Sequence, residues 1–157
     1  MAWIGDNGNC RDCGTDDRQF QYHNLDEPRC YDCKNYENLK YQKFGKTHGR
    51  AGQRKMELTR EQFVEWKRDQ ERICHYCGII TDRDRMFFNQ DLPNPRNGNR
   101  AEALGVDRLD NDIGYVEDNI VIACQYCNYW KSTHITEEQM LQIAPKVMPI
   151  ILAVLAA

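Results

Sequence analysis

The sequence lacks a long hydrophobic run. Its most apolar segment, residues 147–157, has 11 residues and includes Pro149, whereas a helix that crosses a bilayer needs roughly 20 apolar residues. We therefore expect no membrane partner for this protein. The segment is expected to form a terminal helix that packs on the core or on a second copy of the chain, which would make a homodimer.

The sequence also shows no secretory leader. Residues 1–5 pass directly into polar sequence, without the basic segment, apolar stretch and cleavage site of a signal peptide. This absence disfavours a secreted scaffold held by disulfides. We expect a cytoplasmic protein of a bacterium or of a phage-infected cell.

An excess of positive charge, which many nucleic-acid binders carry, is absent from the chain as a whole, because its net charge is -3. The charge is nevertheless uneven: residues 1–33, 34–72 and 73–157 carry -4, +5 and -4. Three glycines in the middle block suggest a loop that could follow a phosphate backbone, although a solvated linker would look the same. The basic residues expected to contact nucleic acid there are Lys40, Lys43, Lys46, Arg50, Arg54 and Lys55.

Cysteine, in contrast, is abundant and regularly spaced. All eight cysteines fall into four Cys-x-x-Cys pairs. Such a pair presents two thiolates to one tetrahedral ion, and two pairs complete the closed shell of a structural zinc. Disulfides and redox-active pairs remain alternatives at this point. We expect two zinc sites, formed by Cys10, Cys13, Cys30 and Cys33 and by Cys74, Cys77, Cys124 and Cys127.

Local signals predict two helices within the middle block, one near each of its ends. Thr59 and Gln62 have the spacing of a capping box, in which each side chain accepts the backbone N–H of the other residue. A helix should follow over residues 60–72. A shorter basic and aromatic helix is expected over residues 36–44.

The C-terminal part repeats this start signal at Thr136 and Gln139. The helix that begins there is expected to end near Ala144, because Pro145 cannot donate the next helical hydrogen bond.

Between these helices the pattern changes to strands. Residues 104–108 and the β-branched run at 119–123 are expected to form two strands, and residues 110–114 have turn chemistry. A helix should begin within the fourth Cys-x-x-Cys pair and reach Lys131. The fold class expected from this order is a small α+β protein stapled by zinc.

The residues of this region resemble those of the HNH, or His-Me finger, endonucleases, particularly small phage-borne members. The shared motifs lie in the same order over residues 74–131, and the likeness continues more loosely upstream. In this sequence they are residues 107–111, 114–115, Asn119 and 124–131. The resemblance implies a ββα-metal core, and with it three regions: a zinc-knuckle module at 1–35, a basic helix and linker at 36–57, and an HNH nuclease domain with C-terminal helices at 58–157.

The resemblance also implies how an ion would be held. Phosphodiester hydrolysis needs negative charge on the phosphate and on the leaving oxygen to be stabilised, which one hard divalent cation can do. Magnesium or manganese prefers oxygen ligands, and the matching residues are Asp107 in the first strand and Asn128 in the helix. Asn128 follows Cys127 directly, so the structural zinc would fix its position.

Four further residues receive catalytic roles from the same comparison. Asn119 would hold the loop between the strands, and Lys131 would face the scissile phosphate. The family places a general-base histidine directly after the metal-binding aspartate, whereas this chain has Arg108. Arginine is a poor proton acceptor, so Arg108 would instead clamp the phosphate. Asp110, or water on the ion, would then serve as the base, unless Asp110 is a second ligand or simply part of the turn.

These expectations combine into a divalent-metal-dependent DNA endonuclease of phage or mobile-element origin, with two structural zinc ions and one catalytic magnesium or manganese ion. The alternative is a zinc-stapled nucleic-acid-binding protein without catalysis, which has lost activity together with the histidine. A third reading is an assembly protein in which zinc only replaces a hydrophobic core.

Overall fold

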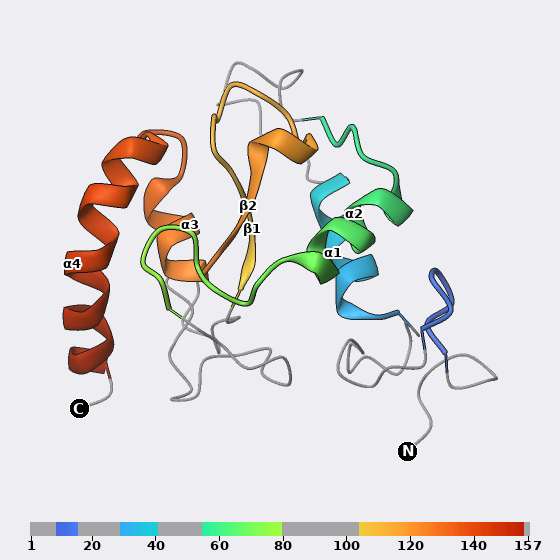
Figure 1. Ribbon diagram of the computed structural model, residues 1–157, viewed down its shortest axis with the longest axis horizontal. Helices are drawn as coiled ribbons and strands as arrows, with labels where there is room; N and C mark the ends of the chain where they lie inside the picture. Colours follow the sequence, from blue (N-terminus) through green and yellow to red (C-terminus); the bar gives the residue numbers. More distant parts are fainter. Residues whose placement is uncertain (1–8, 16–28, 41–54, 80–103, 156–157) are drawn as a thin grey trace. The chain divides into compact units, whose positions relative to one another are not determined.

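The computed structural model describes residues 9–15, 29–40, 55–79 and 104–155. The chain divides into two compact units, Met1–Asp69 and Gln70–Ala157. Helices and one small two-stranded sheet make up the described residues, in agreement with a mixed α+β fold (Figure 1).

The first unit pairs helix α1 (Tyr31–Lys40) with helix α2 (Arg60–Asp69). Tyr36 of α1 and Phe63 of α2 are buried, with ring centroids 5.7 Å apart. The expectation of a helix over 36–44 was wrong at its start, since α1 begins at Tyr31, directly after a cysteine of the second pair. The cysteine pair and the helix are therefore one structural element.

Ion pairs supplement this small apolar core. Asp32 of α1 is buried and lies 3.2 Å from both Lys67 Nζ and Arg68 Nε of α2. Arg60 Nη2 donates to Glu37 Oε1 at 2.6 Å. A buried carboxylate is costly unless it is paired, so these contacts specify how α1 and α2 pack together.

The second unit contains the sheet. Strands β1 (Gly105–Arg108) and β2 (Ile120–Ala123) are antiparallel, with Asp107 opposite Val121. Both strands lie within one residue of the predicted bounds. A short 3-10 helix, η2 (Glu117–Asn119), precedes β2, and helix α3 (Gln125–Lys131) follows it at once.

Helix α4 (Glu137–Leu155) is longer than the sequence suggested. The predicted end near Ala144 was wrong, because the helix continues through Pro145 and Pro149. Both prolines lie on the exposed side, where water can solvate the carbonyls that lose their N–H donors. Met140, Ala144 and Met148 on the opposite side are buried, and their packing outweighs the lost hydrogen bonds.

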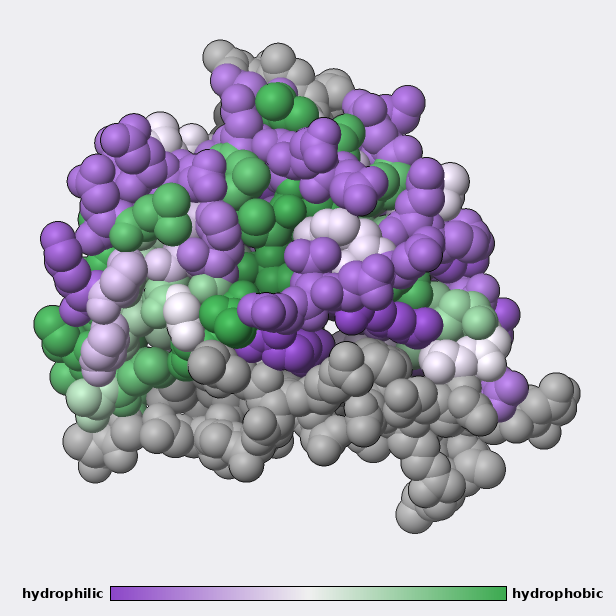
Figure 2. Space-filling model, in the orientation of Figure 1, coloured by the Kyte–Doolittle hydropathy of each residue, from purple (hydrophilic) through white to green (hydrophobic). Residues whose placement is uncertain are grey.

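We expected no membrane partner because the apolar C-terminal segment was too short to cross a bilayer. The length of α4 removes that argument, since a helix of this length can be tested as a membrane span. With 19 residues and a mean hydropathy of 1.3, α4 passes that test by length and composition, although one side of it packs on the core. Its other side exposes Ile143, Ile150 and Val154, and hydrophobic residues gather over the position of α4 in Figure 2.

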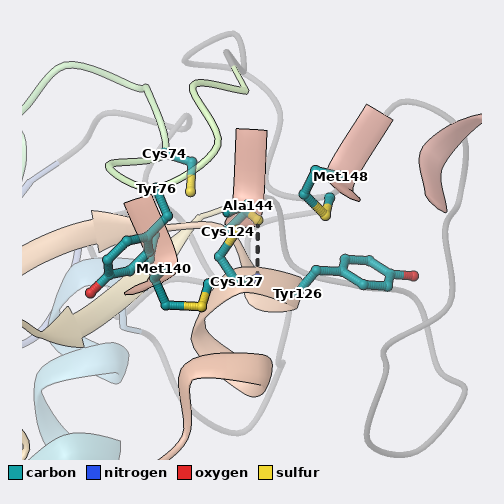
Figure 3. Packing of buried hydrophobic residues seen from close by; sticks show 9 residues of the cluster. Cys74, Tyr76, Cys124, Tyr126, Cys127, Met140, Ala144 and Met148 are labelled. Atoms are coloured by element: carbon teal, nitrogen blue, oxygen red, sulfur yellow. Dashed lines mark hydrogen bonds between the residues drawn. The ribbon is translucent and has the colours of Figure 1, made fainter. Parts of the chain in front are cut away.

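The core of the second unit is built around cysteine (Figure 3). Helices α3 and α4 lie side by side, and between them and the third cysteine pair the buried side chains form one cluster. Its members are Cys74, Tyr76, Ala123, Cys124, Tyr126, Cys127, Met140, Ala144 and Met148. Three cysteines and two methionines thus occupy space that aliphatic side chains fill in most cores.

Both predicted capping boxes are confirmed. Thr59 N donates to Gln62 Oε1 at 2.9 Å and Gln62 N donates to Thr59 Oγ1 at 3.2 Å. The matching bonds at Thr136 and Gln139 measure 3.0 and 3.3 Å.

We predict that Thr136→Ala lowers the free energy of unfolding by about 1 kcal/mol, because it leaves the N–H of Gln139 without its acceptor. Thr136→Ser, which keeps the hydroxyl, is the matched control and should lose much less. Chemical denaturation of the zinc-loaded protein measures both. Equal losses for Ala and Ser would show that the hydroxyl does not matter.

Candidate functional site

The eight cysteines gather into two groups of four. In each group the four sulfur atoms lie within 4.8 Å of one another. Cys13 and Cys30 sulfurs are 3.6 Å apart, and those of Cys77 and Cys124 are 3.9 Å apart. A zinc tetrahedron with Zn–S bonds of about 2.3 Å has sulfur–sulfur edges of ~3.8 Å, whereas a disulfide needs about 2 Å. The cysteines are free, and both groups could hold zinc.

The two groups share one construction. A tight turn carries the first pair in each, closed by Gly14 N donating to Cys10 O at 2.8 Å and by Gly78 N donating to Cys74 O at 2.9 Å. Both glycines have φ +71°, a conformation that other residues rarely adopt. The second pair of each group stands at the start of a helix, α1 or α3. The chain thus uses the same turn-plus-helix unit twice.

The thiols of the second group shift one another's pKa values in opposite directions. Hydrogen bonds from Cys124 and Cys127 strongly lower the pKa of Cys74. The pKa of Cys127 is strongly raised, first by its hydrogen bond with Cys124 and then by those with Cys74 and Cys77. Four thiols this close cannot all ionise alone. A bound cation would allow all of them to become thiolates, which is what zinc coordination requires.

Asp107 lies beside this cluster, on β1. Its carboxylate is buried, and one of its oxygens, Oδ2, accepts the hydroxyl of Tyr76 at 2.7 Å and lies 3.3 Å from Lys131 Nζ. Burial, and then the charge of Asp107, strongly raise the pKa of Tyr76, so this tyrosine stays a donor.

The sequence analysis missed Tyr76. It stands inside the third cysteine pair, between Cys74 and Cys77, and was read only as part of a zinc knuckle. In the structure its ring belongs to the buried cluster and its hydroxyl turns away from the cysteine sulfurs (Figure 3). An aromatic residue with a polar tip, fixed at both sides by zinc ligands, is the signal that could have revealed it.

Asn128 directly follows Cys127 in helix α3. The side-chain nitrogen Nδ2 donates to the carbonyl of Val106 at 3.2 Å, next to Asp107 on β1. This bond turns the other end of the amide, Oδ1, away from Val106. A carboxylate and an amide oxygen on adjacent elements are donors that suit magnesium or manganese, so these residues fit such an ion.

Lys131 and Arg108 do not point to solvent as a phosphate clamp would require. Lys131 is 0% exposed and donates to the carbonyl of Arg108 and to Asn111 Oδ1. Arg108 is also buried, and its Nη1 donates to the carbonyls of Asn111 and Ile113 at 2.8 and 3.0 Å. The guanidinium carbon lies 5.4 Å from the centroid of the Tyr115 ring. Both cations hold the loop between the strands.

Asn119 fastens the same loop from its other end. Its Oδ1 accepts the N–H of Asp110 at 2.9 Å, and its Nδ2 donates to the carbonyls of Asp110 and Gly114, both at 3.0 Å. Asp110 itself is exposed and accepts the N–H of Asp112 at 2.8 Å, as in a turn. Asn119 thus holds the loop between the strands through its side chain, and Asp110 lies in the turn.

The fold resembles that of a known nuclease. The solved structure of the rare-cutting HNH restriction endonuclease PacI, which is described as perturbing DNA, superposes with a TM-score of 0.64. The match covers 90% of this chain and 94% of PacI, at 24% sequence identity. No family model and no curated protein sequence matches the chain. At this identity, the likeness to PacI establishes the fold.

Of the basic residues expected to contact DNA, Lys40 and Lys55 are described, and both are exposed. Lys40 Nζ lies 5.6 Å from the centroid of the Tyr36 ring. The others, Lys43, Lys46, Arg50 and Arg54, lie outside the described residues.

We predict two zinc ions per chain in the purified protein and one in Cys10→Ser or Cys74→Ser, because three thiolates hold zinc less tightly than a closed shell of four. Elemental analysis by mass spectrometry, after dialysis, gives the count. Since the second group lies inside the core, Cys74→Ser should also unfold the second unit, whereas Cys10→Ser should leave it folded. A metal content that is unchanged in both variants would refute this assignment.

Proposed function

We propose that this protein is a divalent-metal-dependent DNA endonuclease. One observation carries the proposal: Asp107 is a buried carboxylate on β1 that accepts the hydroxyl of Tyr76, and the side-chain amide of Asn128 bonds to the carbonyl of Val106, the residue before Asp107. The activity named for PacI, which shares the fold, supports it. We extend the proposal to the ions expected above, two structural zincs and one catalytic magnesium or manganese, and to a phage or mobile-element origin.

Asp107 and Asn128 would hold the catalytic ion. When bound, this ion supplies the positive charge that stabilises the phosphate and the leaving oxygen during hydrolysis. The chain supplies rigidity: Asn119 and Arg108 fix the loop that follows β1, and Tyr76 fixes the carboxylate of Asp107. Preorganised groups of this kind need not reorganise as charge develops.

The proton acceptor differs from the histidine of the family. Two histidines are described. His75 bonds to Glu137 at 2.7 Å and stands between Cys74 and Cys77, and His134 is exposed beyond the end of α3, away from the family position after Asp107 in the sequence. Arg108 is engaged with loop carbonyls, and Tyr76 donates to Asp107. We propose Asp110 as the base, because its carboxylate is exposed at the end of β1 and can meet a water molecule.

The second candidate function is nucleic-acid binding without catalysis. It is favoured by Arg108, which occupies the position of the family histidine and serves the loop. Both candidates share the DNA partner and the zinc sites, so only a cleavage assay separates them.

We predict that the protein nicks or cuts supercoiled plasmid with Mg²⁺ or Mn²⁺. Asp107→Ala and Asn128→Ala should each lower the rate by roughly 100-fold or more, since each removes an ion ligand. Asp118→Ala, an exposed acid on η2, is the matched control and should retain the activity. DNA binding without cleavage by any divalent ion would favour the second candidate.

The basic block is expected to supply affinity for the DNA backbone. The double variant Lys40→Glu/Lys55→Glu should bind DNA more weakly at low salt. The double variant Lys40→Gln/Lys55→Gln should reduce the slope of log K against log salt concentration by about 2. Fluorescence anisotropy with labelled duplexes measures both. A slope that does not change would show that neither lysine meets a phosphate.

For the assembly, we propose a homodimer through the exposed apolar side of α4, formed by Ile143, Ile150 and Val154. We propose a cytoplasmic location in a bacterium or an infected cell. The first unit, with its own cysteine group, would contribute to the choice of DNA site.

A further inference from the structure

The ammonium of Lys131 has three protein partners. They are the carbonyl of Arg108, Oδ1 of Asn111 at 3.2 Å and Oδ2 of Asp107 at 3.3 Å. The first two are hydrogen bonds and the third is an ion pair. Because the side chain is also 0% exposed, its ammonium faces protein groups and not solvent, although the sequence suggested that it would face a phosphate.

Lys131 and Tyr76 approach the same atom of Asp107. The hydroxyl of Tyr76 and the ammonium of Lys131 both lie against Oδ2, at 2.7 and 3.3 Å. One hydrogen bond and one ion pair at the same oxygen favour a single rotation of the carboxylate and leave its second oxygen, Oδ1, outside both contacts. A carboxylate oriented in this way is typical of metal ligands, whose free oxygen meets the ion.

We propose that Lys131 is a positioning residue that compensates the charge of Asp107 before the catalytic ion binds, and leaves Oδ1 of Asp107 as the ligand atom. The inference rests on the proposed metal-dependent function. A buried carboxylate without a partner is strongly disfavoured, so a metal-free site with Asp107 alone would be unstable. With Lys131 in place, the site is formed in advance and the ion binds to a rigid carboxylate.

The test replaces Lys131 with Met, an unbranched side chain one atom shorter, which removes the charge. Without divalent ions, Lys131→Met should melt on the order of 10 °C below the wild type, because Asp107 loses its compensating charge. Millimolar Mg²⁺ should recover at least half of this loss in the variant, and should shift the wild type much less. Mg²⁺ prefers oxygen ligands over thiolates, so the zinc groups do not contribute to the response.

Two further variants keep the test decisive if Lys131→Met folds poorly. The double variant Lys131→Met/Asp107→Asn removes both charges and should recover stability without any response to Mg²⁺. Tyr76→Phe removes one hydrogen bond to Oδ2 and no charge; it should weaken Mn²⁺ binding roughly 10-fold, measured by the loss of the free-ion resonance signal.

A readout on DNA separates positioning from phosphate contact. If Lys131 touched a phosphate, Lys131→Met would lower the salt slope of DNA binding by about 1, whereas we expect no change. A lower salt slope for Lys131→Met, or a loss of melting temperature that Mg²⁺ does not recover, would overturn the inference. If the wild type still cleaves DNA and binds Mn²⁺ in that case, the proposed function stands. Absence of both wild-type activities would remove the proposed function and this inference with it.

Discussion

The rest of the second unit depends on the meeting of four cysteine sulfur atoms at one point. Those of Cys74, Cys77, Cys124 and Cys127 lie within 4.8 Å of one another, too close for all four thiols to ionise without a cation. A zinc ion would balance four thiolates, bind each of them strongly and join the third cysteine pair to the start of α3. In a unit with a two-stranded sheet and few aliphatic core residues, such bonds replace packing that a larger hydrophobic core would provide.

The same constraint determines where the polar residues of the site lie. Tyr76 stands between two ligands and Asn128 directly follows a third, so neither residue can move without disturbing the cluster. Tyr76 reaches Asp107, and Asn128 reaches the adjacent carbonyl of Val106. The four cysteines and the proposed ion ligands are therefore mechanically coupled. In the first unit, Asp32 stands between Cys30 and Cys33 and pairs with Lys67 and Arg68 of α2, so that cysteine group is coupled to the packing of α1 and α2.

Local signals in the sequence predicted what local interactions decide. The capping boxes at Thr59 and Thr136 depend on residues three positions apart, and both form as expected. The end of α4 was mispredicted, because the packing of Met148 on a distant cluster outweighs the effect of Pro145 on its own turn. The partners of Lys131 were missed for a similar reason: Arg108 and Asn111 lie about 20 residues earlier, and only the folded chain brings them to its ammonium.

Asp107, Arg108 and Lys131 form an unusual set of three buried charged side chains on neighbouring elements. Each would be costly alone, and together they leave one net positive charge before any ion binds. The carbonyls of Asn111 and Ile113 take up that surplus by accepting the guanidinium of Arg108. Arg108 therefore ties the loop after β1 to the strand that carries Asp107. Because its guanidinium is engaged in this way, the proposed catalysis assigns the proton acceptor to Asp110, whose side chain is exposed in the same loop.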